Sequence, residues 1–144
     1  MKLHALLAST LLALSFLSAS AQNTPEKTPM EKSMEALDAA FKEVRKALRA
    51  PDAAQKEQYL KWVETIKTEA AKCKDLVPKK IAELPTDQQA PLIEAYKKDM
   101  DKFITAIDSL GKALSEEKWA DAEAIIKDMG KQKSSGHEQY KKEE

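Results

Sequence analysis

One stretch decides the fold: residues 28–48, which read TPMEKSMEALDAAFKEVRKAL. Thr28 can cap a helix by accepting a hydrogen bond from the backbone of Glu31, the Glu31 side chain can return the bond, and Pro29 suits the first helical position. The apolar side chains that follow are spaced four and three residues apart in turn, which is the repeat of one helix face. They are Met30, Met34, Leu37, Phe41, Val44 and Leu48. The stretch therefore predicts an amphipathic helix that Pro51 ends.

Three further stretches repeat this pattern. Asp52 and Gln55 are placed to cap a second helix, which Pro78 ends, and Thr86 and Gln89 form another capping pattern at the start of a third. Residues 79–85 form a connector with room for one helical turn, and a short turn at 115–118 precedes the fourth helix. The predicted stripes are Tyr59, Val63, Ile66, Ala70, Cys73 and Val77; then Leu92, Tyr96, Met100, Phe103, Ile107, Leu110 and Leu114; then Trp119, Ala122, Ile126 and Met129.

Composition supports the same fold class. Ala, Lys, Glu and Leu dominate, only 3 residues are Gly and 6% are aromatic, so an all-β fold is disfavoured. Four amphipathic helices joined mostly by short links predict an all-α protein, an up-down-up-down antiparallel four-helix bundle. In that topology the start of the first helix and the end of the fourth lie at one end of the bundle.

The first residues predict export. Residues 1–21 read as a signal peptide, with Lys2 before an apolar run and Ala19-Ser20-Ala21 as the cleavage site. Residues 22–27 form a polar lead-in, and residues 28–144 form the bundle domain. We therefore expect a periplasmic protein with no membrane span after signal cleavage, since the apolar run is too short to cross a bilayer.

Charge and reactive residues exclude several classes of function. The 24 basic and 24 acidic side chains give no net charge, which disfavours nucleic acid as a partner. A single cysteine, Cys73, excludes an internal disulfide and is expected to be a small core residue. No nucleophile with a partner base and no glycine-rich phosphate loop is present, so we do not expect an enzyme.

The end of the fourth helix departs from the pattern. After Met129 the apolar stripe gives way to small and polar residues that include Gly130 and Gly136, with His137 next to the second glycine. A fraying C-terminus explains this composition. The alternative is that small residues leave room beside the histidine for a bound group. Bundle topology brings His137 opposite the first helix. Residue spacing alone does not select Met34 over Met30 as the methionine that faces it, and filling the core is the simplest role for any methionine. Val77, Pro78, Leu92 and Tyr96 are expected to line the same region.

The sequence resembles the cytochrome b-562 family, periplasmic four-helix bundles that hold haem b without covalent attachment. The resemblance rests on Ser33-Met34-Glu35-Ala36-Leu37 with Lys42, on Asp52-Ala53-Ala54-Gln55, on Ile107-Asp108, and on an ungapped register from Trp119 to Lys141. It implies that Met34 and His137 are the axial ligands of the haem iron, a known pair of haem ligands.

The resemblance also assigns secondary positions. Lys133 and Lys141 stand where the family commonly has arginine near the haem propionates, and a lysine can neutralise a propionate only as a point charge. Tyr96 keeps one aromatic haem contact, whereas Met100 replaces another. Relatives with covalent haem would carry cysteines at 133 and 136, so non-covalent haem b is expected here.

The expected function is electron transfer, because two axial ligands leave no open position on the iron for catalysis. The partner would be a redox protein that the sequence does not identify, and the chain is expected to be a monomer. The alternative is a haem-free periplasmic bundle that binds a protein partner.

Overall fold

The computed structural model describes residues 26–141, which form a four-helix bundle. The long helices are α1 (Pro29–Ala47), α2 (Lys56–Lys74), α4 (Thr86–Ser115) and α5 (Trp119–Tyr140). A 3-10 turn, η1 (Ala53–Gln55), precedes α2, and a short helix, α3 (Lys79–Ala82), links α2 to α4. No strand occurs in the described part of the chain. The all-α, up-down-up-down prediction is confirmed, while the predicted signal peptide lies outside the described residues.

Helix α1 begins as its sequence predicts. The backbone N–H of Glu31 donates to Thr28 Oγ1 at 3.2 Å, and the Thr28 N–H donates to Glu31 Oε2 at 2.7 Å, which completes the capping box. The hydrogen bonds from Thr28 lower the pKa of the Glu31 carboxyl. The cap thus fixes where α1 starts and which of its faces turns towards the core.

Helix α2 is shorter at both ends than the predicted cap at Asp52 and the apolar stripe to Val77 suggest. Asp52 does cap a helical turn, accepting from the Ala54 N–H at 2.9 Å, but that turn is η1 and α2 follows it. At the other end α2 stops at Lys74, so the prediction that Val77 belongs to the buried stripe is wrong: this side chain is 45% exposed. A residue before proline avoids the helical conformation, and the chain turns away before Pro78.

Helix α4 also differs at its start. Thr86 is the first helical residue rather than the cap, and Pro85 occupies the cap position without a side-chain hydrogen bond. Gln89 does not close a capping box; its amide donates to the carbonyls of Ala82 and Leu84 and so ties α4 to α3. The predicted capping box is therefore wrong, although the helix starts where it was expected.

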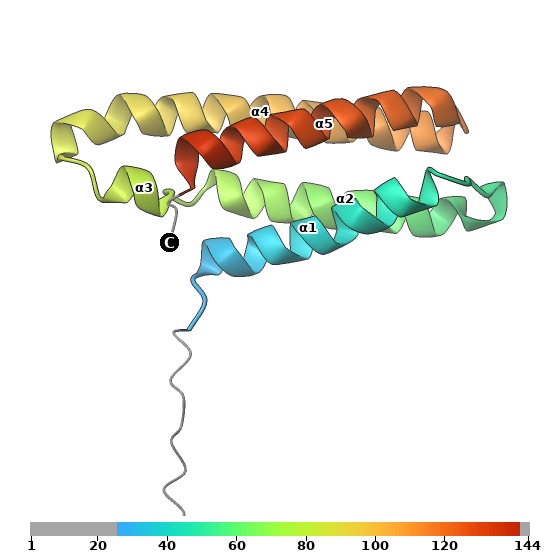
Figure 1. The fold of residues 1–144 in the computed structure, drawn as a ribbon, viewed down its shortest axis with the longest axis horizontal. Coiled ribbons are helices and arrows are strands. Elements are labelled where there is room, and N and C mark those ends of the chain that lie inside the picture. The colour runs from blue at the N-terminus through green and yellow to red at the C-terminus, as the bar shows by residue number, and fades with distance from the viewer. Residues whose placement is uncertain (1–25, 142–144) are drawn as a thin grey trace, which may run out of the picture.

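The first turns of α4 extend beyond the other long helices, with only α3 beside them (Figure 1). Leu92 lies in this overhang and is 38% exposed, so the expectation that it lines the same region as Tyr96 is wrong. The stripe becomes buried from Tyr96 onward, where α4 meets α2 and α5. The heptad pattern identified the apolar face, but it could not indicate where the neighbouring helices end.

The core is formed by the four predicted stripes. Its fully buried side chains include Leu37, Phe41, Val44, Ile66, Cys73, Ile107, Leu110, Leu114 and Met129. Burial raises the pKa of the Cys73 thiol to about 11, in keeping with a structural role on α2. On α5 the buried stripe stops at Met129, and Gly130, Lys133, Gly136 and His137 are only half-buried.

The four sides of the bundle are not equally closed. The helices pack closely as α1 on α2, α2 on α4 and α4 on α5, whereas the backbones of α1 and α5 stay further apart. Figure 1 shows α1 diverging from α5 towards the end of the bundle that carries α3. We call this fourth side the α1–α5 seam. It is bridged by side chains rather than by close backbone packing.

A matched pair of leucines on α4 tests this description of the core. Leu110→Ala should lower the free energy of unfolding by about 2–5 kcal/mol, because it leaves a cavity at a fully buried site. Leu92→Ala should cost less than about 1 kcal/mol, since this side chain already contacts solvent. Urea unfolding followed by circular dichroism measures both values. Equal losses would contradict the assignment of Leu92 to the overhang.

Candidate functional site

Three contacts set the register of α5 against α1 across the seam. Lys133 Nζ pairs with Asp38 Oδ1 at 2.7 Å, and the same ammonium lies 5.3 Å from the centre of the Phe41 ring. One turn earlier on α5, a Cβ built on Gly130 would lie 4.0 Å from Phe41 Cζ. Gly130 therefore faces Phe41, and Lys133 faces Asp38. The two helices run antiparallel with a single consistent offset.

This register brings the predicted ligands to the same level. His137 follows Lys133 by one helical turn, and Met34 precedes Asp38 by one turn on the same face of α1. In antiparallel helices these two steps run in the same direction, so Met34 and His137 lie on facing sides of the seam. Both side chains are half-buried, and Met34 also packs against the core.

The surroundings of His137 favour its neutral form. Burial lowers the pKa of the imidazole, the nearby Lys133 ammonium lowers it further, Asp38 opposes the shift, and Lys141 adds a smaller lowering. Asp38 lies on α1, so its influence on this pKa is consistent with the register set by the Lys133–Asp38 pair. A neutral imidazole keeps a nitrogen lone pair, which is the form that binds a metal.

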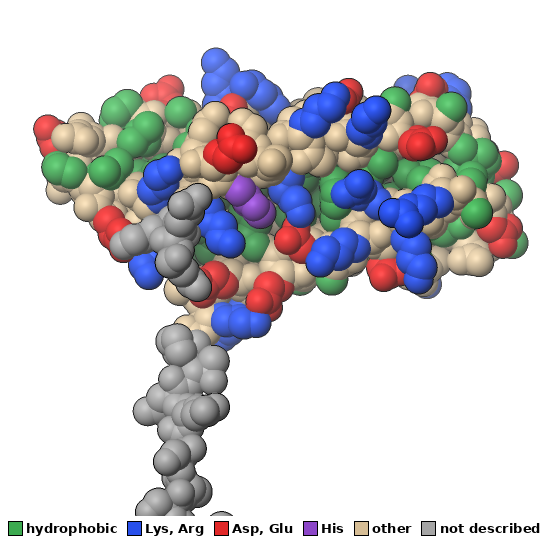
Figure 2. Space-filling model, in the orientation of Figure 1, with side chains coloured by type: hydrophobic (Ala, Val, Ile, Leu, Met, Phe, Trp, Pro, Cys, Tyr) green, Lys and Arg blue, Asp and Glu red, His purple; other side chains and the backbone are tan. Residues whose placement is uncertain are grey.

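Gly136, the residue before His137, has open space on its own side of α5. A Cβ built on Gly136 would meet no atom within 4 Å, in contrast to Gly130, which faces the Phe41 ring. Helix α5 remains helical to Tyr140, so the open space at Gly136 does not come from a helix that has already ended. Figure 2 shows the histidine side chain at the surface of this face, with Lys and Arg side chains on either side. The prediction of room beside His137 for a bound group stays a prediction, with open space shown at Gly136.

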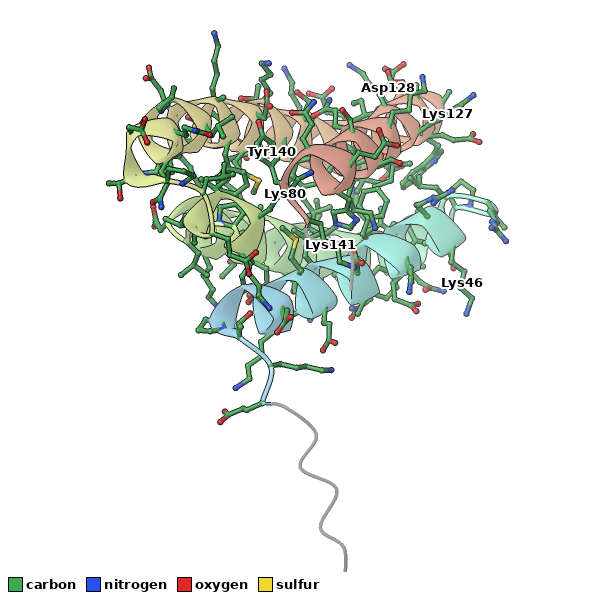
Figure 3. All side chains as sticks on the ribbon, turned by 60° about the vertical axis from the view of Figure 1, so that its left-hand side comes forward. Lys46, Lys80, Lys127, Asp128, Tyr140 and Lys141 are labelled. Atoms are coloured by element: carbon green, nitrogen blue, oxygen red, sulfur yellow. The ribbon has the colours of Figure 1, made fainter. Side chains whose placement is uncertain are left out.

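The last turn of α5 is held by contacts that sequence reasoning did not identify. Tyr140 donates its hydroxyl hydrogen bond to Asp99 Oδ2 at 2.9 Å, and its ring meets Tyr96 edge-on with the centroids 5.1 Å apart. Lys80 of α3 donates to the carbonyl of Glu138 at 3.0 Å. Figure 3 shows Tyr140 and Lys80 close together at this end of the bundle. These contacts fix the helical turn that carries His137.

Asp99 takes part in a contact between helices, although it stands among charged residues in the sequence. Its carboxylate is half-buried, and hydrogen bonds from Lys102 and Tyr140 lower its pKa. Burial and the contact with Asp99 raise the pKa of Tyr140 to about 12, so Tyr140 stays a hydrogen-bond donor at neutral pH. A lone aspartate between lysines gives no sequence signal of such a distant partner.

The remaining predicted site residues lie in different surroundings. Tyr96 is buried, and its hydroxyl donates to the carbonyl of Cys73 at 2.8 Å, so it offers the site only its ring, from behind Tyr140. Lys141 is exposed at the end of α5, where its backbone N–H donates to the carbonyl of His137. The structure therefore brings Met34, Lys133 and His137 together, with Lys141 at the rim and Tyr96 in the wall behind.

Comparison with known families decides the wider identity of the chain. The family model for cytochrome b562 matches residues 29–141, which is nearly all of the described structure. The chain belongs to the cytochrome b562 family. This cytochrome b562 family member is accordingly a haem-binding electron-transfer protein, of a family that is not typically enzymatic. No curated protein matches the chain significantly. Within residues 26–141, every helix is too short or too polar to span a bilayer.

The residues at the seam fit a haem better than a bare metal ion. A thioether and an imidazole whose neutral form is favoured face each other across the seam, and both are known haem-iron ligands. Among the described residues, no group of three or more His, Cys, Asp or Glu side chains could hold a metal ion alone. An iron bound here therefore needs most of its ligands from a macrocycle.

The lowered pKa of His137 predicts a pH-dependent stability of the haem-free protein. Its folded-state pKa lies below the ordinary value of about 6.5, so the unfolded chain binds more protons between the two values. The contribution of His137 to the free energy of unfolding should be fully present above about pH 6.5. It should fall as the pH drops from there towards the folded-state pKa, and below that pKa it should not change further. Urea unfolding at a series of pH values should reveal this component in the parent protein and not in His137→Gln. An identical pH dependence in both proteins would contradict the assigned burial of the imidazole.

Proposed function

We propose that this chain is a periplasmic electron carrier that binds haem b non-covalently, with Met34 sulfur and His137 imidazole as the axial ligands of the iron. The observation that carries the proposal is the shared level of these two side chains across the open α1–α5 seam. It follows from the Lys133–Asp38 pair and the Gly130–Phe41 approach, and does not depend on the family. The family membership supplies the class of cofactor.

The register also supports Met34 over Met30. Met30 lies one further turn towards the start of α1, at the level where α5 has already ended after Tyr140. No ligand on α5 could face it from a helical turn. Met34, in contrast, faces a turn of α5 that is held in place by the contacts of Tyr140 and Lys80.

Each residue at the site has a distinct task in this proposal. Haem with Met/His ligation supplies a one-electron couple whose potential is raised by the thioether. His137 reaches the seam already in its neutral form, so ligation does not require loss of a proton near neutral pH. Lys141 is free to neutralise a propionate, whereas Lys133 would have to exchange Asp38 for it. Lys133 and Gly136 carry no thiol and Cys73 is buried on α2, which supports a non-covalent attachment.

Export and partners complete the proposal. The signal-peptide pattern in residues 1–21 supports a periplasmic location, where a redox partner protein would exchange electrons with the haem. The balanced charge of the chain argues against a nucleic-acid partner, and we propose that the chain acts as a monomer.

A haem titration of the chain from residue 22 onward tests the axial ligands. We expect a shifted Soret band and a six-coordinate low-spin spectrum in both oxidation states. Met34→Ala and His137→Ala should each lose the low-spin spectrum, because one axial position is left without its ligand. Met30→Ala is the matched control and should keep it. Added imidazole should restore the parent spectrum in His137→Ala, because it replaces the missing imidazole ligand. In Met34→Ala it should not restore the parent spectrum, because imidazole is not a thioether.

Two outcomes would contradict the proposal. Absence of any Soret shift in a folded parent protein would favour the haem-free bundle that binds a protein partner. Equal effects of Met30→Ala and Met34→Ala would show that the register has been misassigned.

Replacing Gly136 separates the stability of the bundle from the space for haem. Gly136→Ala should stabilise the haem-free protein by up to about 1 kcal/mol, because alanine favours a helix and its methyl group meets no neighbour. The same methyl group should weaken haem binding, since it occupies space beside His137. Gly111→Ala on α4 is the control: its Cβ would lie 3.4 Å from a Val63 methyl group in the core, and haem binding should not change. Unaltered haem affinity in Gly136→Ala would mean that the open space is not used.

A further inference from the structure

A second feature of the α1–α5 seam lies beyond the proposed haem site, towards the end of the bundle opposite α3. Here the seam is hollowed into a groove of about 330 Å³. Three exposed cations surround it, Arg45 and Arg49 from the α1 side and Lys127 from α5, while the buried side chains of Leu48 and Ile126 form its floor. Glu123 is the one carboxylate in its lining. We call this the basic groove.

Among the described residues, the cations of the basic groove are not neutralised by an ion pair. Within residues 26–141, no ion pair or side-chain hydrogen bond involves Arg45, Arg49 or Lys127, and Glu123 is not within ion-pair distance of any of them. The α2–α4 side of the bundle differs. There Lys67 pairs with Asp108 at 2.6 Å, and Lys74 pairs with Asp101. Charge is therefore matched across the α2–α4 side of the bundle, and at Asp38 and Lys133 on the α1–α5 seam, but it is left unmatched at the basic groove.

Helix capping explains only part of this arrangement. Basic residues in the last turn of a helix interact favourably with its dipole, which accounts for Arg45 and the neighbouring Lys46. Arg49 lies beyond the end of α1, and Lys127 lies in the middle of α5, where no such benefit applies. Figure 3 shows Lys46 and Lys127 at the same end of the bundle, on α1 and α5 respectively. The cations that line the groove come from both sides of the seam, Arg45 and Arg49 from the α1 side and Lys127 from α5.

We propose that the basic groove is the docking site for an acidic segment of a partner protein. The chain has no net charge, so its surface as a whole does not attract anions. A concentration of unpaired cations at one place produces a local positive field there, which favours carboxylates. A groove of this volume accepts a few side chains, and its apolar floor suits an aliphatic residue between two carboxylates. An acidic segment with an embedded aliphatic side chain matches both features.

The basic groove lies on the same seam as His137, about 16 Å along α5 from it, measured from Ile126 at about 1.5 Å per residue. Figure 2 shows Lys and Arg side chains continuing along this face on both sides of the histidine. A protein seated in the groove would therefore cover the seam near the proposed haem. That this partner exchanges electrons with the chain rests on the proposed function, whereas the binding of an acidic segment does not.

Nuclear magnetic resonance with the isotope-labelled chain from residue 22 onward, with and without haem, tests the proposal. The probe is a short peptide of alternating glutamate pairs and single leucines, added at low ionic strength. We expect shifts confined to the residues around Arg45, Arg49 and Lys127, and their loss as salt screens the charges. Arg45→Glu combined with Arg49→Glu should weaken binding by about tenfold or more, because two charge-assisted contacts become repulsive.

Lys97→Glu combined with Lys112→Glu is the matched control. It makes the same change of net charge on α4, which does not line the groove, and should leave binding within about twofold of the parent. Circular dichroism checks that both variants stay folded, as expected for exposed positions. Equal weakening by the two double variants would overturn the proposal, since overall charge alone would then explain the binding.

Two further probes identify other ligands. If inorganic phosphate at the same concentration reproduces the shifts and displaces the peptide, the groove is a small-anion site and the proposal is wrong. If vesicles rich in phosphatidylglycerol bind through Arg45 and Arg49 while the peptide does not, the groove meets a membrane and the proposal is again wrong. Because peptide binding is measured on the haem-free protein too, its failure is distinguishable from failure to bind haem.

Discussion

The ion pair between Lys133 and Asp38 is the interaction on which the site depends. It is half-buried and spans the one side of the bundle where helix backbones do not pack closely, and it lies beside the Phe41 ring. A partly buried ion pair of this kind adds little to the stability of the fold. It does help to set the register of α5 against α1, because the two side chains meet at one offset of the helices. Slipping α5 by one turn would separate this pair and would also move Gly130 away from Phe41. The levels of His137 and Met34 both follow from this offset.

Most of the fold could be predicted because short stretches of sequence determine each helix. A capping box at Thr28, a repeat of four and three, and prolines at the ends of helices are short-range signals, and the structure confirms the helices that they predict. The errors at Val77, Leu92 and Thr86 all lie at the ends of helices. Helix α2 stops before Pro78, Gln89 bonds to α3 instead of closing a cap, and Leu92 extends past the neighbouring long helices. A single helix pattern carries no information about such contacts or about the length of the helix it packs against. Helix α4 keeps its heptad repeat into a region where only α3 remains to cover it.

The site was predictable only in part, for a similar reason. His137 stood out because it is the single histidine left after the predicted signal cleavage and because glycines precede it. The partners that hold it in place did not stand out. Asp38, Asp99 and Lys80 are ordinary surface residue types, and their roles arise from contacts between helices that are far apart in the chain. The family resemblance selected Met34, and the register from Asp38 to Lys133 gives an independent physical reason for the same choice.

The open seam has a consequence for how the bundle moves. Helices α2 and α4 each pack on two neighbours, while α1 and α5 are each held closely by one. The molecule is thus built as two helical hairpins joined along their inner helices, and its least costly opening is a swing of the outer helices away from each other. Such an opening breaks the Lys133–Asp38 pair and exposes little of the core between α2 and α4. A flat macrocycle could enter edge-on by this motion while the inner helices stay packed, so loading need not require global unfolding.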